Sequence, residues 1–405
     1  MTSVRDSNEW TRAGWTRAAL GFLLVSVLLS CASTRDPVYS LKAKGKNPYY
    51  QSYSEAAPTA RTAMAQTSLE LLLRADAAWV ADLTQEAKGF GGLDPTAADV
   101  LPILGSLQPG ILRWDPAAQM MRLDDASSIE RGPYWLELVR AEAAGLALAR
   151  DNGVRDYQPG ACASSYAQAL REHSSTSQVE APAPLDPALA SLFTQPTEPQ
   201  KMFDAAVKAS NSNLVDAIAG RSPGAQVRQP RKGGDGELLV QSTDRKIAEW
   251  RELRPNAALP AAWTGGARAA TPAERCAWFK RALTVARPGF GGDCTVLNDH
   301  AYGEYPLPNL SFAMDLEKVT TGAQLRAVMQ ALCRQAAVVH ITAWNPGARN
   351  RASLALRGHP ALQSRLVRLA FQTTEKLFSA HQMIFDDRAA EEKAEDKQKQ
   401  TGPKP

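Results

Sequence analysis

Apolar residues recur at helical spacing through most of the chain. Between Thr62 and Lys88 they return every three or four positions, which is the pattern of an amphipathic helix. Pro133 is suited to open a second long helix, and Asn152-Gly153 to end it. The same spacing predicts further helices around Cys162 as far as His173, at 199–219, 243–253 and 272–287, from Thr321, and from Pro360.

Strands with alternating apolar and polar residues are scarce. Residues 238–242, with the sequence Leu-Leu-Val-Gln-Ser, are predicted to form one short strand. We therefore expect a mainly α protein, a bundle-like globular domain with a few short strands. Helical folds of this kind host many unrelated activities, so function has to be argued from particular sites.

Changes in composition suggest the domain organisation. Residues 174–200 are rich in Ser, Thr, Pro and Ala, and we interpret them as a linker or long loop. They would separate a helical half at 62–173 from a second helical half at 201–387. Residues 31–61 lack helical periodicity and are predicted to be a tether. Residues 388–405 are charged without an apolar face and are predicted to be a disordered tail.

The two halves share one sequence feature. Each contains an Ala-Trp pair in a predicted helix that closes with Gly-Phe-Gly-Gly, ending at Gly92 in the first half and at Gly292 in the second. Two related halves produced by duplication would explain this echo. Coincidence is the alternative, because glycine commonly follows helices for geometric reasons.

The N-terminus has the pattern of an export signal. Arg5, Arg12 and Arg17 precede an apolar run over residues 18–29, which is a basic segment followed by an apolar segment of secretory length. A membrane-spanning helix needs about 18–20 apolar residues, so this run is too short to span a bilayer. We interpret residues 1–30 as a signal peptide.

Leu28-Leu29-Ser30-Cys31 resembles the lipobox of bacterial lipoproteins. The resemblance implies that Cys31 receives a diacylglyceryl thioether, is freed by cleavage after Ser30 and is then N-acylated, so that two or three chains anchor it durably. Ala32 stands where an Asp retains enterobacterial lipoproteins in the inner membrane, which implies the outer membrane. The alternatives are an ordinary signal peptide with a chance cysteine and an uncleaved signal anchor.

Four cysteines remain besides Cys31, an even number in a protein expected to reach an oxidising compartment. Sequence alone allows three pairings. We favour Cys276–Cys294, which closes the shortest loop, together with Cys162–Cys333, which would join distant parts of the chain. One or more free thiols are the alternative.

Cys294 is also the centre of the sharpest enzyme hypothesis. Asp293-Cys294 after glycines resembles the nucleophile region of NlpC/P60-type peptidoglycan peptidases, and His340 follows at a separation that this family allows. The resemblance implies a thiolate at Cys294 with His340 or His300 close to it as the base. Thr295-Val296 departs from the Ser-Gly of that family, and a disulfide at Cys294 would exclude the thiolate.

His300 lies in a polar and aromatic cluster with Asp299, Tyr302, Glu304 and Tyr305. Carboxylates beside aromatic rings suit carbohydrate binding, and carboxylate pairs of the glycosidase type have no fixed spacing in sequence. A surface loop stiffened by neighbouring prolines is the alternative interpretation.

Metal binding is not indicated by the sequence. Cys333 and His340 are seven residues apart and would share one helix face, but a zinc site needs three or four ligands. The chain contains neither a CxxC nor an HExxH motif. We predict no metal and no other cofactor.

The net charge of +4 and the ordinary 22% content of charged residues do not call for a nucleic-acid partner. We predict an outer-membrane lipoprotein, anchored in lipid through Cys31, whose periplasmic or surface-exposed helical module binds or scaffolds an envelope protein or a cell-wall component. No catalytic site is assigned. The alternatives are a cell-wall-acting thiol hydrolase of NlpC/P60-like type and an inhibitor or immunity lipoprotein directed against such enzymes.

Overall fold

The structure is a computed structural model. It describes residues 46–87, 100–105, 107–115, 120–123, 130–172, 187–194, 199–209, 212–221, 223–230, 238–254, 270–286, 292–306, 312–344, 346–358 and 360–401. Contacts between residues divide the chain into Met1–Lys46 and Asn47–Pro405, and every element below belongs to the second unit. The predicted signal peptide, Cys31, most of the predicted linker and most of both Gly-Phe-Gly-Gly segments lie outside the described residues.

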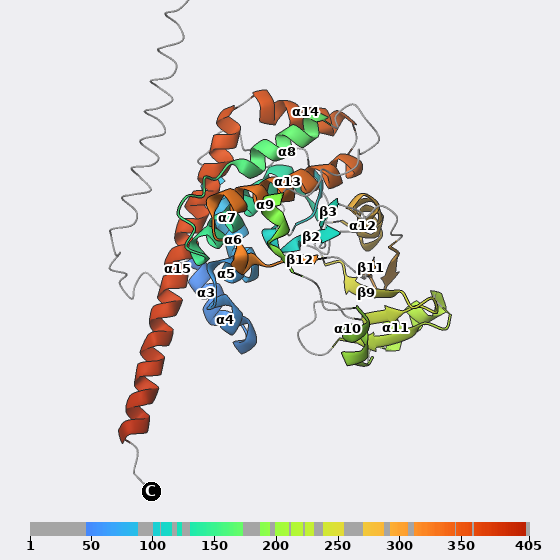
Figure 1. Cartoon of the computed structure of the whole chain (residues 1–405), viewed down its shortest axis with the longest axis horizontal. Helices are drawn as coiled ribbons and strands as arrows, with labels where there is room; N and C mark the ends of the chain where they lie inside the picture. The colour runs from blue at the N-terminus through green and yellow to red at the C-terminus, as the bar shows by residue number, and fades with distance from the viewer. Residues whose placement is uncertain are drawn as a thin grey trace, which may run out of the picture. The chain divides into compact units, whose positions relative to one another are not determined.

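Helices make up most of the described chain, which confirms the mainly helical prediction (Figure 1). With the labels of Figure 1, the α-helices are α3 (Pro48–Glu55), α4 (Pro58–Met64), α5 (Ser68–Arg74), α6 (Asp76–Ala87), α7 (Tyr134–Asp151), α8 (Ala161–Glu172), α9 (Pro187–Ala190), α10 (Pro199–Ala205), α11 (Ser212–Arg221), α12 (Pro272–Ala286), α13 (Gly322–Ala343), α14 (Pro346–Gly358) and α15 (Pro360–Thr401). The described residues also include two short 3-10 helices, η1 (Pro109–Ile111) and η3 (Leu316–Lys318).

The described strands form three antiparallel sheets, so the fold is mixed α and β rather than the bundle with a few short strands that the sequence predicts. The strands are β1 (Val100–Ile103), β2 (Leu112–Asp115), β3 (Met120–Leu123), β4 (Glu130–Pro133), β5 (Phe193–Thr194), β6 (Val207–Lys208), β7 (Gln226–Gln229), β8 (Leu238–Gln241), β9 (Ile247–Glu252), β10 (Cys294–Leu297), β11 (His300–Pro306) and β12 (Phe312–Met314). Their orders are β1-β4, β3-β2-β12-β5 and β10-β11-β9-β8-β7-β6. The predicted strand at 238–242 corresponds to β8.

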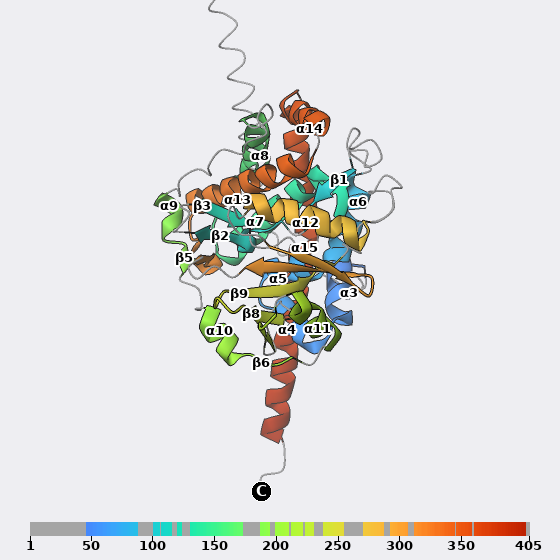
Figure 2. The same cartoon turned by 90° about the vertical axis from the view of Figure 1, so that its right-hand side faces the viewer.

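The six-stranded sheet is covered on both faces by helices (Figure 2). Leu238, Val240 and Trp250 pack with Leu214 and Ile218 of α11 on one face. On the other face, α12 packs against β10 and β11. The first four residues of β9, Ile-Ala-Glu-Trp, are all buried, so the strand lacks the regular alternation of a half-exposed strand, and residues 243–253 were not recognised as a strand in the sequence.

Residues 31–61 are predicted from the sequence to be a tether without helical periodicity, but α3 and the first residues of α4 lie within this range. The Asn47 side chain accepts hydrogen bonds from the backbone of Tyr49 and Tyr50 at the start of α3, and Tyr49 is completely buried. The single helix expected over Thr62–Lys88 is divided into α4, α5 and α6, with Thr67 capping α5.

Helix α7 lies at the centre of the unit. Fifteen of its eighteen residues are buried, as expected for a helix contacted on several sides. It packs against α5, α8, α13 and α15, while α13 also packs against α8. Helices on both sides of residues 174–200 therefore share one core, whereas the sequence analysis expected separate halves.

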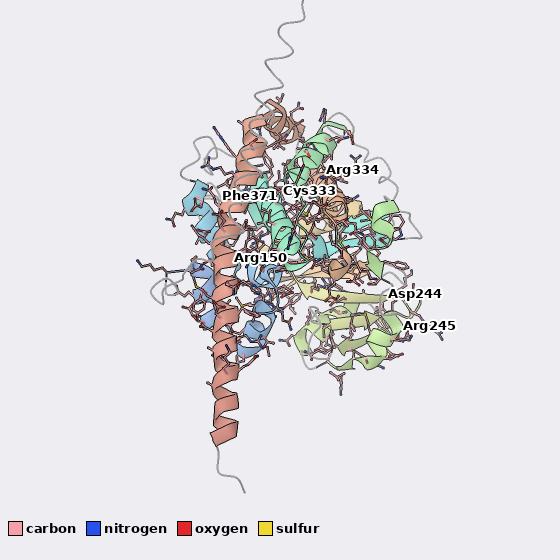
Figure 3. All side chains as sticks on the ribbon, turned by 60° about the vertical axis from the view of Figure 1, so that its left-hand side comes forward. Arg150, Asp244, Arg245, Cys333, Arg334 and Phe371 are labelled. Carbon is pink, nitrogen blue, oxygen red and sulfur yellow. A yellow bond between two sulfur atoms is a disulfide. The ribbon has the colours of Figure 1, made fainter. Side chains whose placement is uncertain are left out.

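Helix α15 runs along the side of α7 and continues to Thr401 (Figure 1). The prediction of a disordered tail from residue 388 is therefore wrong for residues 388–401. Its Ala, Glu, Lys and Gln residues have high intrinsic helix propensity and need no apolar face to remain helical. At the far side of the fold, Asp244 and Arg245 form the tip of the β8–β9 hairpin, where Arg245 has a φ of 63° (Figure 3).

Candidate functional site

Cys294 begins β10 and is bonded to Cys276 of α12. The two residues are only 6% and 8% exposed. A thiol nucleophile requires a thiolate, and a disulfide sulfur has none. Cys294 is therefore excluded as the nucleophile of a thiol peptidase while this bond is intact.

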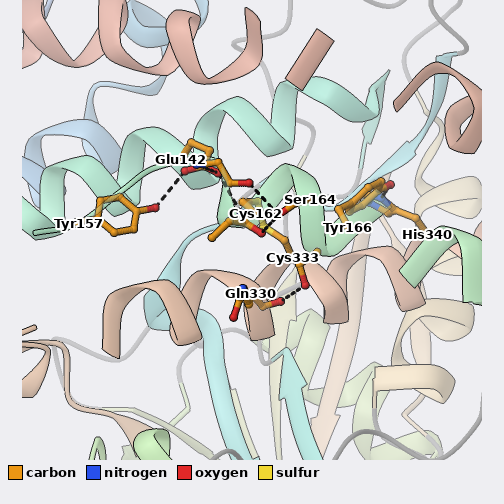
Figure 4. The surroundings of a disulfide bond; sticks show 11 residues. Glu142, Tyr157, Cys162, Ser164, Tyr166, Gln330, Cys333 and His340 are labelled. Atoms are coloured by element: carbon orange, nitrogen blue, oxygen red, sulfur yellow. Dashed lines mark hydrogen bonds between the residues drawn. A yellow bond between two sulfur atoms is a disulfide. The ribbon is translucent and has the colours of Figure 1, made fainter. Parts of the chain in front are cut away.

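The second disulfide joins Cys162 of α8 to Cys333 of α13. These are the two pairs favoured from the sequence. Figure 4 shows the carboxylate of Glu142 beside Cys162. Its Oε1 accepts hydrogen bonds from the backbone N–H groups of Gly160 and Cys162, both at 3.0 Å, and its Oε2 accepts one from the Tyr157 hydroxyl at 3.1 Å. Burial raises the pKa of Glu142, and these hydrogen bonds oppose the rise.

His340 lies in a different place, buried on α13. Its Nε2 is 2.7 Å from Oε2 of Glu137 on α7, and its Nδ1 is 2.7 Å from the hydroxyl of Tyr166 on α8. The His340 and Glu137 side chains are 2% and 1% exposed. The Trp344 ring stacks on the imidazole with centroids 4.9 Å apart, and the backbone N–H of Gly105 donates to Glu137 Oε1 at 2.6 Å. Both imidazole nitrogens thus contact side chains of the core, and neither contacts Cys294.

His300 begins β11 after a tight turn in which Asn298 and Asp299 have positive φ angles of 49° and 63°. Its side chain is 56% exposed, and its Nδ1 lies 2.5 Å from Oε1 of Glu252. Burial opposes ionisation of Glu252, but hydrogen bonds from His300 and Arg254 hold the pKa of this carboxyl below its usual range. Exposed ion pairs of this kind contribute little to stability.

The polar and aromatic cluster expected around His300 is divided between two faces of the sheet. Tyr305 is 2% exposed and packs edge-on against Phe279 of α12. Tyr302 instead packs with the apolar cluster around Trp250, on the α11 side. The two rings therefore do not form one aromatic platform for a sugar.

Asp293, just before β10, and Glu304 of the neighbouring strand β11 have carboxyl pKa values shifted in opposite directions. Burial raises the pKa of Glu304, and the charge of Asp293 adds to the rise. Burial also acts on Asp293, but hydrogen bonds from Lys280 and from the Cys294 backbone, with the charge of Arg221, keep its pKa below the usual range. Neighbouring carboxyls of this type occur at acid–base sites. Here the Asp293 carboxylate already forms ion pairs with Arg221 and Lys280, and the Asp293 backbone N–H donates to the Glu304 carboxylate at 3.0 Å. These contacts stabilise the start of β10.

Sequence reasoning missed Glu137, Glu142 and Tyr166. Helix α7 is apolar around most of its circumference, with few acidic residues inside that run. The signal available in the sequence is the presence of a glutamate in such an apolar helix, because a buried carboxylate needs a polar partner and therefore indicates a buried contact. The identity of that partner, on α8 or α13, cannot be read from the sequence of α7.

Within the described ranges, no group of three or more His, Cys, Asp or Glu side chains could hold a metal ion. None of the helices in these ranges is both long and apolar enough to cross a bilayer. In comparisons with known proteins, no protein-family model, no curated protein and no solved structure matches the chain.

Proposed function

We propose that the chain is an exported lipoprotein of the bacterial cell envelope, anchored through Cys31, whose Asn47–Pro405 unit binds or scaffolds another envelope component. The observation that carries this proposal is the pairing of all four cysteines other than Cys31 in two disulfides. Stable disulfides are characteristic of proteins in oxidising compartments and are rare in the cytosol. The lipobox-like Leu28–Cys31 segment supports the same compartment independently.

Binding is favoured over catalysis because of how the candidate groups are used. Cys294 has no free thiol, the nitrogens of His340 contact Glu137 and Tyr166 in the core, and Asp293 is bound by two cations. A thiol hydrolase would need a reactive thiolate near a histidine. The outer membrane is the proposed location because Ala32 follows the cysteine of the lipobox-like segment.

Mass spectrometry of the unreduced protein from native membranes tests the proposal. We expect an acylated N-terminal Cys31 and no free thiol at the other four cysteines. Cys31→Ser should release the protein from the membrane fraction, whereas Ser30→Ala keeps a small residue before the cysteine and should leave anchoring intact. An unmodified Cys31, or a Cys294 that alkylates rapidly at neutral pH, would refute the proposal.

A further inference from the structure

Three buried side chains form a relay that joins α7, α8 and α13. The hydroxyl of Tyr166 lies 2.7 Å from Nδ1 of His340, and the two rings lie beside each other in Figure 4. On the other side of the imidazole, Nε2 lies 2.7 Å from Oε2 of Glu137. Each of the three residues is at most 1% exposed. A substrate cannot reach these groups in the folded unit, so chemistry here has to proceed by moving an electron or a proton through the core.

The contacts of His340 set the direction of the hydrogen bond in this relay. A neutral imidazole carries a hydrogen on one ring nitrogen and accepts a hydrogen bond at the other. Because Nε2 faces the Glu137 carboxylate, which can only accept, the hydrogen lies on Nε2. Nδ1 is then the acceptor, and the Tyr166 hydroxyl donates to it. The phenol therefore has a base in place for its proton.

Two further aromatic rings adjoin the relay. Tyr134 is stacked on Tyr166 with ring centroids 6.1 Å apart, and Trp344 is stacked on His340 with centroids 4.9 Å apart. Tyr134 and Trp344 also contact each other, at 5.7 Å, and Tyr134 is the least buried of these residues, at 7% exposed. These separations are those of ordinary aromatic contacts. Because phenol and indole rings lose single electrons readily, the cluster lets an electron leave Tyr166 without a bound ligand.

We propose that Tyr166 is a redox-active tyrosine that loses one electron to a small radical oxidant while its proton moves to His340. The oxidant, a one-electron acceptor such as the carbonate or nitrogen dioxide radical, is reduced by an electron that leaves through the adjoining rings. The O–H bond of Tyr166 breaks, and an N–H bond forms at Nδ1 of His340. The products are a neutral tyrosyl radical, an imidazolium and the reduced oxidant.

The surroundings of Tyr166 couple the two transfers. Burial raises the pKa of the Tyr166 hydroxyl well above its usual range, and the charge of Glu137 adds to the rise, so the phenol keeps its proton at neutral pH. A phenol that has lost an electron is strongly acidic, and Nδ1 of His340 accepts its proton. The Glu137 carboxylate, which also accepts the backbone N–H of Gly105 at 2.6 Å, lies against the new imidazolium. The positive charge is therefore paired inside the core, as a buried charge requires.

Tyr157 is the contrasting tyrosine of the same core. It is 8% exposed, and its hydroxyl donates to Oε2 of Glu142 at 3.1 Å rather than to a histidine. Transfer of its proton to Glu142 would neutralise a carboxylate that already accepts from the backbone of Gly160 and Cys162, and those charge-assisted hydrogen bonds would weaken. We therefore expect the radical at Tyr166 and not at Tyr157.

A short pulse of radicals tests the proposal. Full-length protein carrying Cys31→Ser has no free thiol, because its other four cysteines are paired in disulfides. Azide radicals from pulse radiolysis oxidise tyrosine and tryptophan, and the tyrosyl radical is followed by its optical absorption and by freeze-quench EPR. We expect a long-lived tyrosyl radical that Tyr166→Phe abolishes and that Tyr157→Phe leaves unchanged.

His340→Gln keeps polar groups beside Tyr166 and Glu137 but removes the base, so formation of this radical should slow by about a hundredfold. In the protein with an intact relay, EPR should detect an exchangeable proton hydrogen-bonded to the radical oxygen, a measurement that does not depend on how the variants fold. Circular dichroism verifies that each variant folds. A long-lived radical that survives Tyr166→Phe, an unchanged rate in His340→Gln, or a radical without the exchangeable proton would overturn the proposal. Because Cys31 is absent from the assay, the result is independent of the proposed lipid anchor.

Discussion

Breaking the two disulfides separately should destabilise the protein to different extents. Cys162 and Cys333 are 171 residues apart in sequence, whereas Cys276 and Cys294 are 18 apart. In the chain-entropy model a cross-link restricts the unfolded chain more when the loop is longer. The model gives about 5 kcal/mol for the long loop and about 3 kcal/mol for the short one at 25 °C. The α8–α13 bond should therefore contribute more than the α12–β10 bond by about 2 kcal/mol.

Double-mutant cycles isolate these contributions from the loss of sulfur packing. Cys162→Ala in the intact protein removes both the cross-link and a buried side chain, but in a Cys333→Ala background it removes the side chain alone. The same cycle on Cys276 and Cys294 serves as the matched comparison. Urea unfolding followed by far-UV circular dichroism yields each free energy of unfolding. Equal coupling energies, or a larger one for the short loop, would refute the entropic reasoning.

Two further predictions concern other contacts of the core, at Glu142 and at Gly322. Burial raises the pKa of Glu142, so the folded state binds the Glu142 proton more tightly than the unfolded chain does. The stabilisation from this proton is therefore complete below about pH 4.3 and is lost as the pH rises through the folded pKa. Glu142→Gln should flatten the decline of the free energy of unfolding above that pH, and parallel pH profiles for the variant and the unaltered protein would contradict this. A methyl group on Gly322 would lie 2.5 Å from the backbone oxygen of Asp156, whereas at Gly220 it would meet nothing within 4 Å. Gly322→Ala should therefore lower the free energy of unfolding by about 1–3 kcal/mol, whereas Gly220→Ala should leave it unchanged or raise it. Equal shifts in the urea midpoint for the two variants would count against a close approach of Gly322 to Asp156.

Helix ends were the most predictable features of the fold, because local chemistry sets them. Thr321 and Gln324 form a capping box at the start of α13, which begins where the sequence predicts. Pro360 begins α15, and Gly153 follows α7 with a φ of 68° that favours glycine. Each of these signals involves neighbours within a few residues, so a single sequence contains all of the information needed.

Contacts between distant segments could not be predicted in the same way. Glu137, Tyr166 and His340 come from three helices, and nothing near any one of them specifies the other two. The strand β9 was missed because four successive positions of Ile-Ala-Glu-Trp-Arg-Glu are buried, including a glutamate, and the regular alternation that identifies a strand is absent. The cysteines are the exception among long-range contacts, since so few of them are available that loop length restricts the choice of pairs.

Several carboxylates of this core share one structural role, which explains why no active site is assigned to them. Three of them, on α7 and just after it, bind the starts of three other helices. Glu142 accepts from Cys162 in α8, Asp151 accepts from the backbone of Ser68 and Leu69 in α5 at 2.9 Å, and Asp156 accepts from Gly322 in α13 at 2.9 Å. The unpaired N–H groups at a helix start carry partial positive charge, which a carboxylate satisfies. Acids used in this way orient helices around α7 and are not available for proton transfer.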